Sequence, residues 1–271
     1  MTPTNGSPQF STPAALSKHP NIFIGGMPGA GKTSFLGSVG KGNRVLIADP
    51  EGGTATFRSA WFQGRESSAA LDDLHVMSFG EETKAQEVLF KVESALDYLI
   101  RTKNSDGYAL FAVDSLTELQ EQFMHLHPAS DRRQAYGAFR DGLHTIIHKA
   151  KQAPLPTIFT ARLKATYDEV QGREIIRPEI SPGAWGIAAG LFDNIGLFDL
   201  KAQGVRTTRS LEFAFTTRFP GKDRLDLGAL TDPTFEAMVA SLNGETEDAP
   251  AQPARKPVTR KPAAKRPGGS S

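Results

Sequence analysis

Short apolar runs alternate with longer amphipathic segments along the central part of the chain. The runs are rich in β-branched and aromatic side chains, a pattern that predicts β-strands. We place these strands at residues 21–25, 44–48, 75–78, 109–113, 157–161, 195–200 and 211–216. Strands that alternate with helices form a mainly parallel central sheet flanked by helices on both faces, so the pattern predicts a single-domain α/β fold.

The amphipathic segments between the strands predict helices, because their apolar residues recur every three or four positions. The clearest helices span residues 82–101, 116–124 and 134–151, and shorter ones span 32–39 and 233–242, with Asp232 as the expected N-cap of the last. Near residues 167–176, two polar and apolar runs flank Gln171-Gly172. This arrangement predicts a protruding hairpin or a mobile loop after the fifth strand.

The two ends of the 271-residue chain differ in composition from its centre. Residues 1–18 are rich in Thr, Ser, Pro and Asn, and residues 244–271 are rich in Pro, Ala, Lys and Arg. Such segments bury too little apolar surface to fold, so we expect two disordered tails around one domain at residues 19–243. The net charge is +1, but the last 28 residues hold six basic and three acidic side chains, which leaves the rest slightly acidic. The basic tail either holds nucleic acid weakly or aids solubility.

The absence of cysteine excludes disulfides, thiolate zinc sites and cysteine nucleophiles. No segment approaches the roughly 18 consecutive apolar residues that a membrane helix needs, and the N-terminus lacks the apolar centre of a signal peptide. We therefore expect a cytoplasmic protein with no membrane partner.

A glycine-rich segment follows the apolar run 22–24 directly. From Gly26 to Thr33 it fits G-x-x-x-x-G-K-[ST], the pattern of a loop whose backbone N–H groups converge on phosphate oxygens. Lys32 supplies a positive charge, and the Thr33 hydroxyl can bind Mg²⁺. A glycine-rich turn without a ligand is the alternative, but a strand before the segment and a helix after it favour the phosphate loop. The predicted phosphate-binding residues are Gly26, Met27, Pro28, Gly29, Ala30, Gly31, Lys32, Thr33 and Ser34.

A second Mg²⁺ ligand is expected at Asp114, which closes the apolar run 108–113 and precedes Ser115. A carboxylate at the end of a buried strand is costly unless a cation or hydrogen-bond donors compensate it. A metal site is therefore favoured over a simple helix cap at this position.

The group that activates water for attack on a phosphate is expected at Glu51, which follows the strand at residues 44–48. No Glu follows Asp114 directly, so the acidic pair that is usual in AAA+ ATPases is absent, and Glu118 is a weak substitute. The carboxyl ends of parallel strands share one edge of a sheet, so Glu51 should lie beside the phosphate loop. A charged turn between strand and helix is the alternative.

The order of these motifs resembles that of the RecA-like ATPases: a phosphate loop, a strand that ends in Asp-x-Glu, and a strand that ends in Asp-Ser. The segments 23–34, 49–52 and 113–115, with the late Lys222-Asp223-Arg224, are similar to the small RecA-like nucleotide-binding proteins of bacteriophages. That group includes the Sak-four-type single-strand annealing proteins. The resemblance covers about residues 19–243, although only the phosphate loop is specific by itself. It implies a RecA-like P-loop NTPase fold with ATP and Mg²⁺ as ligands.

The resemblance also implies roles for individual residues. Glu51 becomes the water-activating base and Asp114 the Mg²⁺ ligand, and Thr160 or Arg162 replaces a missing Gln as the sensor of the γ-phosphate. The DNA-binding residues implied are Lys164, Arg173 and Arg177, and the catalytic cations that reach the neighbouring subunit are Lys222 and Arg224. Such cations accelerate phosphoryl transfer, so hydrolysis would require oligomerisation. Surface-exposed charged turns are the alternative for both sets.

The leading interpretation is an ATPase that acts on single-stranded DNA in phage recombination, by annealing, or in replication within a bacterial host cell. The resemblance suggests a homo-oligomer, a ring or a filament, and a single-strand-binding protein as a candidate partner. One alternative is a regulatory nucleotide-binding module, such as a helicase loader. The other is a P-loop kinase of small molecules, although the sequence shows no convincing arginine-rich lid.

Overall fold

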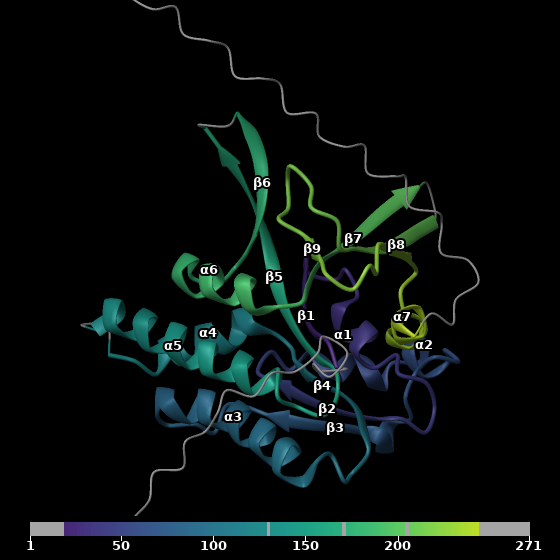
Figure 1. The fold of residues 1–271 in the computed structure, drawn as a ribbon, viewed down its shortest axis with the longest axis horizontal. Coiled ribbons are helices and arrows are strands. Elements are labelled where there is room, and N and C mark those ends of the chain that lie inside the picture. The colour runs from purple at the N-terminus through teal and green to yellow at the C-terminus, as the bar shows by residue number, and fades with distance from the viewer. Residues whose placement is uncertain (1–18, 129–130, 170–171, 204–205, 244–271) are drawn as a thin grey trace, which may run out of the picture.

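The computed structural model describes residues 19–128, 131–169, 172–203 and 206–243 (Figure 1). Both predicted tails, residues 1–18 and 244–271, lie outside this described part. The strands are β1 (Asn21–Gly26), β2 (Arg44–Asp49), β3 (Leu74–Ser78), β4 (Tyr108–Val113), β5 (Thr157–Asp168), β6 (Arg173–Pro178), β7 (Asn194–Gln203), β8 (Arg206–Glu212), β9 (Lys222–Asp223) and β10 (Ala229–Thr231). The helices are α1 (Lys32–Leu36), α2 (Ala60–Gln63), α3 (Ala85–Thr102), α4 (Leu116–His125), α5 (Arg132–Ala150), α6 (Pro182–Leu191) and α7 (Phe235–Leu242), with the 3-10 helices η2 (Gly53–Arg58) and η3 (Leu71–Asp73).

The strands form a mixed sheet that is mostly parallel, in the order β10-β8-β7-β1-β5-β4-β2-β3. All neighbours from β7 to β3 are parallel, whereas β8, β9 and β10 pair in antiparallel fashion at one side. β1 therefore lies between β7 and β5, and β5 separates it from β4. The predicted α/β fold with a mainly parallel sheet is confirmed.

Helices cover both faces of the sheet because alternate residues of each strand point to opposite sides. Phe23 belongs to the core that packs under α3, α4, α5 and α6, whereas Ile22 and Ile24 belong to the core that packs under α1 and α7. The two groups of helices lie on opposite sides of the sheet in Figure 1. All three of these β1 side chains are fully buried, and each such burial contributes about 1.5–3 kcal/mol.

β5 runs well past the predicted end at residue 161. Its first half lies in the sheet, where Gly26 of β1 is level with Arg162. Its second half pairs with β6 in a hairpin that extends from Leu163 opposite Pro178 to Asp168 opposite Arg173. The hairpin projects away from the body of the sheet (Figure 1). The predicted protruding hairpin is confirmed, and residue 171 of its expected turn lies outside the described residues.

Other element boundaries also differ from the predictions. The helix after the phosphate loop ends at Leu36, not at residue 39, because Gly37 closes it as the C-cap. The strand expected at 211–216 is β8, which ends at Glu212, where its antiparallel register with β7 stops. Phe213 is still fully buried, so its apolar side chain reflects packing after the chain has left the sheet.

The N-cap expected at Asp232 is also wrong. Thr234 caps α7, since its Oγ1 accepts the Ala237 N–H at 3.1 Å. Helix α6 was not predicted, because its glycine-rich segment shows little amphipathic periodicity. Its signal was Ser181-Pro182, because proline is favoured at the first helical position. No helix in the described residues is long and apolar enough to cross a membrane.

Candidate active site

The phosphate loop connects the central strand β1 to α1 at the carboxyl edge of the sheet. Gly29 and Gly31 have φ angles of 74° and 110°, in the left-handed region that favours glycine. A Cβ at Gly31 would also lie 3.0 Å from the Arg209 Nε. The loop therefore depends on glycine at both positions for its conformation.

Lys32 is folded back over this loop. Its Nζ donates to the carbonyl oxygens of Gly26 at 2.9 Å and Met27 at 3.2 Å, and the residue is 8% exposed. Burial lowers the pKa of the Lys32 ammonium, while Asp114 and Glu51 act in the opposite direction. Hydrogen bonds between two charged groups are stronger than those to neutral carbonyls, so Lys32 is placed to exchange these carbonyls for a phosphate oxygen.

Asp114 lies at the end of β4 and receives two hydroxyl groups. Thr33 Oγ1 donates to Oδ2 at 2.6 Å, and Thr160 Oγ1 donates to Oδ1 at 2.5 Å. Asp114 is 2% exposed. Burial raises the pKa of its carboxyl, and the two hydroxyl hydrogen bonds limit the rise. The structure thus brings together both predicted metal ligands and one of the two predicted sensors.

The residues around Asp114 fit a Mg²⁺ ion. Thr33 and Asp114 offer hydroxyl and carboxylate oxygens, the hard donors that Mg²⁺ prefers. Gly53 passes close to both, because a Cβ at this position would lie 3.4 Å from Thr33 Oγ1 and 3.9 Å from Asp114 Oδ2. Glycine here leaves open the space beside these oxygens. Mg²⁺ and a nucleotide phosphate are therefore compatible with the site.

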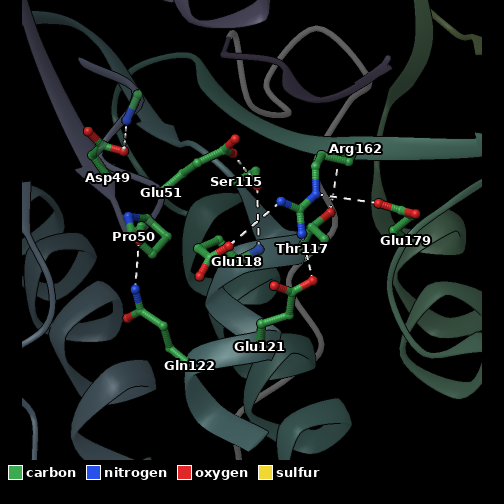
Figure 2. Close-up of polar contacts among 11 residues, drawn as sticks. Asp49, Pro50, Glu51, Ser115, Thr117, Glu118, Glu121, Gln122, Arg162 and Glu179 are labelled. Atoms are coloured by element: carbon green, nitrogen blue, oxygen red, sulfur yellow. Dashed lines mark hydrogen bonds and ion pairs between the residues drawn. The ribbon is translucent and has the colours of Figure 1, made fainter. Parts of the chain in front are cut away.

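The two acidic residues after β2 take different positions. The Asp49 carboxylate accepts the backbone N–H groups of Gly53 at 3.1 Å and Thr54 at 2.9 Å, so it fixes the start of η2. Glu51 is exposed at the same edge as the phosphate loop, and its Oε2 accepts the Ser115 hydroxyl at 3.0 Å (Figure 2). Glu51 is therefore the carboxylate of this pair that is available to a water molecule.

Arg162, the other predicted sensor, lies among three carboxylates (Figure 2). Its guanidinium is 2.5 Å from Glu121, 3.4 Å from Glu179 and 3.8 Å from Glu118. Its backbone N–H also donates to Thr117 Oγ1 at 3.0 Å. Partial burial lowers the pKa of Arg162, but the hydrogen bond to Glu121 and the carboxylate charges outweigh it and raise the pKa. Arg162 thus ties α4 to β5 and to the segment after β6.

Glu118, the weak substitute for the base, belongs to this Arg162 group. Partial burial and the charge of Glu121 raise the pKa of Glu118, while Arg162 opposes the rise. Arg162 holds the Glu118 carboxylate in an ion pair at 3.8 Å, whereas the Glu51 carboxylate is exposed beside the phosphate loop. The geometry therefore favours Glu51 over Glu118.

Lys222 and Arg224 lie away from the phosphate loop of their own chain. β9 pairs with the first residues of β7, at the opposite edge of the sheet from the loop. The Lys222 Nζ donates to the carbonyl oxygens of Ala189 at 3.3 Å, Gly190 at 3.2 Å and Phe192, and so closes the end of α6. Arg224 is 3.7 Å from Asp193. Their action on a neighbouring subunit stays a prediction.

The predicted DNA-binding residues lie on the β5–β6 hairpin. Lys164 and Arg177 are cross-strand partners and line a hollow of about 730 Å³, whereas Arg173 lies opposite Asp168 at the far end of the hairpin. The other walls of the hollow are α5 and the start of α6. Side chains that line it include Arg133, Tyr136, Arg140, Lys164, Arg177 and Glu179.

The residues on the α5 side of this hollow were not predicted as binding residues. Arg133, Tyr136 and Arg140 are spaced three and four residues apart, which places them on one face of a helix. That spacing was a usable signal. The spacing points to a binding surface only because the β5–β6 hairpin lines the same hollow as α5.

Most of the described part of the chain matches one protein family. Residues 18–225 match the family model described as an AAA domain. The match includes the phosphate loop, Glu51, Asp114 and the β5–β6 hairpin. A comparison with curated proteins found no match.

Proposed function

Because this chain belongs to the AAA domain family of P-loop ATPases, we propose that it binds ATP with Mg²⁺, hydrolyses the nucleotide and acts on single-stranded DNA. The observation that carries the proposal is that one strand, β5, joins the two sites. Its Thr160 contacts Asp114 in the phosphate-loop site, and its Lys164 lines the basic hollow.

Hydrolysis is assigned to residues at the carboxyl edge of the sheet. Lys32 binds phosphate oxygens, and Thr33 and Asp114 hold the Mg²⁺ ion, which supplies charge neutralisation on the phosphates when bound. Glu51 accepts the proton of the attacking water. The Ser115 hydroxyl holds the Glu51 carboxylate in place at 3.0 Å.

Single-stranded DNA fits the hollow between α5 and the β5–β6 hairpin. Four cations line it, Arg133 and Arg140 from α5 and Lys164 and Arg177 from the hairpin, against one carboxylate from Glu179. Cations at this density bind a phosphate backbone. Tyr136, which is 43% exposed, adds an aromatic surface on which a base can stack.

The biological setting follows from the resemblance to the RecA-like proteins of phages. We place the activity in phage recombination, through annealing, or in replication, in the cytoplasm of a bacterial host. A homo-oligomer would bring Lys222 and Arg224 of one subunit toward the nucleotide of the next. A single-strand-binding protein remains a candidate partner.

The test measures ATP hydrolysis and DNA binding by the full chain with and without single-stranded DNA. We expect stimulation by DNA, and we expect hydrolysis to fall by about 10²-fold or more in Glu51→Gln. The double variant Arg133→Ala/Arg140→Ala should weaken DNA binding. It should also make the plot of log binding constant against log salt concentration less steep, by about 0.7 for each phosphate contact that is lost. Arg44→Ala/Arg101→Ala is the matched control, because both arginines are exposed and lie away from the hollow.

Each part of the proposal can fail separately. Hydrolysis without any DNA binding would exclude a role on DNA and would favour the alternative, a P-loop kinase of small molecules. Equal loss of DNA binding in both double variants would mean that the hollow is not the DNA site. Full hydrolysis in Glu51→Gln would remove Glu51 as the base.

A further inference from the structure

A second, smaller pocket opens beside the phosphate loop, on the side of the sheet that α1 covers. It has a volume of about 280 Å³, near the lower end of the range for small-molecule sites, about 300–1,000 Å³. Gly31 and Ser34 of the loop region form one wall. The pocket is thus continuous with the segment that is expected to bind phosphates.

Arg209 of β8 reaches into this pocket and carries an unpaired donor. Its Nε is buried and has no hydrogen-bond acceptor among the described residues. The same Nε lies 3.0 Å from the position of a Cβ on Gly31, so it is adjacent to the phosphate loop. A buried donor without an acceptor is costly, and an oxygen of a bound ligand would remove that cost.

The backbone around Arg209 is held firmly. The Arg209 N–H donates to Asp232 Oδ1 at 3.1 Å, and the Asp232 N–H donates to the Arg209 carbonyl at 2.7 Å. Asp232, the residue wrongly predicted as a helix cap, therefore positions β8 beside the pocket. The guanidinium is presented from a fixed strand and not from a loose loop.

Trp61 forms the aromatic wall of the pocket. The guanidinium carbons of Arg65 and Arg209 lie 4.9 Å and 5.2 Å from the centroid of its ring. Trp61 is 48% exposed, although an indole packed for stability alone is usually buried. Indole rings and guanidinium planes both stack on nucleobases.

We propose that this pocket holds the nucleoside end of the bound nucleotide. The base packs on the wall of Trp61 and Arg65, and Arg209 donates to an oxygen where the ribose joins the first phosphate. Gly31 and Ser34 connect the pocket to the phosphate loop, so one ligand spans both. This inference rests on the proposed binding of ATP and adds the residues that recognise its nucleoside.

The test uses the fluorescence of Trp61. The chain has two tryptophans, and Trp185 packs against Phe23 at a ring-centroid distance of 4.7 Å, so Trp185→Phe leaves Trp61 as the sole indole. In this background ATP should change the fluorescence. Inorganic tripolyphosphate, which has no nucleoside, should bind the phosphate loop with little change.

Calorimetry supplies an independent readout. We expect Trp61→Ala and Arg209→Ala each to raise the Kd for ATP by about tenfold or more. For tripolyphosphate, Trp61→Ala should change the Kd by less than about twofold, because a stacking contact acts on the base and not on the phosphates. Arg218→Ala is the matched control, since its side chain is 60% exposed and pairs with Glu174 on the hairpin.

Thermal melts identify any variant that fails to fold, and Arg209→Lys then replaces Arg209→Ala. Unchanged ATP binding in folded Trp61 and Arg209 variants, with binding lost in Lys32→Ala, would overturn the nucleoside pocket and leave ATP binding intact. No binding of ATP by the unmodified protein would overturn the proposed function as well. Equal effects of Trp61→Ala on ATP and tripolyphosphate would also refute the pocket.

Discussion

Replacing Thr160 with valine removes one hydroxyl from the buried carboxylate of Asp114 and nearly preserves side-chain shape. Thr160 is fully buried, and its Oγ1 donates to Asp114 Oδ1 at 2.5 Å. A hydrogen bond to a charged group contributes about 1.5–3 kcal/mol, and one between neutral groups about 0.5–1.5 kcal/mol. We therefore expect the free energy of unfolding of Thr160→Val to fall by about 1.5–3 kcal/mol where Asp114 is ionised.

The decrease in the free energy of unfolding caused by Thr160→Val should become larger as pH rises. Burial raises the pKa of folded Asp114 above its unfolded value, so its ionisation destabilises the fold as pH rises from the unfolded to the folded pKa. Thr160 limits that destabilisation by donating to the carboxylate. Without the hydroxyl the folded pKa rises further, so the difference in stability between the two proteins should be larger at pH 8 than at pH 5.

Thr157→Val is the matched control on the same strand. Thr157 is also fully buried, but its Oγ1 donates to the neutral Asn21 Oδ1 at 3.0 Å. Its loss should be independent of pH. Urea unfolding followed by circular dichroism, in EDTA to keep metal from Asp114, measures both variants at both pH values. An equal loss at pH 5 and pH 8 for Thr160→Val would refute an ionised, hydroxyl-stabilised Asp114.

Three further outcomes are expected. Gly53→Ala places a methyl group 3.4 Å from Thr33 Oγ1 and should raise the Mg²⁺ concentration needed for half-maximal hydrolysis. The Kd for ATP in EDTA should change by less than about twofold. An unchanged Mg²⁺ titration would contradict the proposed metal site. Lys222→Met removes the donor that closes α6 and should lower the free energy of unfolding by about 1 kcal/mol in urea. Arg162→Met should lower the ratio of DNA-stimulated to unstimulated ATP hydrolysis toward one, because Arg162 lies between the two proposed sites. Arg218→Ala is the control in the same assay. An unaltered ratio would mean that Arg162 does not connect DNA binding to hydrolysis.

The sequence was sufficient to predict the phosphate loop and its closest partners. The loop is a contiguous motif, and Thr33 follows Lys32 within it. Asp114 comes from a distant segment, yet it directly follows the buried strand β4, and parallel strands end at one edge of the sheet. Thr160 was expected at this site only from the family resemblance, as an alternative to Arg162, and its contact with Asp114 became evident in the structure.

The pocket residues depended on information that local patterns do not contain. Arg209 reaches Gly31 only because β8 pairs with β7 and β7 pairs with β1. Strand order is set by packing across the whole sheet, so no window of sequence around Arg209 indicates it. Trp61 is also hard to assign from the sequence, because a large aromatic residue is most often part of a core.

β5 gives the two proposed sites a common structural element. Thr160, Arg162 and Lys164 occupy alternate positions on it, and at about 3.3 Å per residue the strand spans about 13 Å from Asp114 to the basic hollow. Between these ends, Arg162 joins α4 through Glu121 and the β6–α6 segment through Glu179. If β5 has two conformations, a ligand at either site can shift the equilibrium between them only by the difference in its affinity for the two. Because such coupling is reciprocal, any factor by which DNA tightens nucleotide binding must equal the factor by which nucleotide tightens DNA binding.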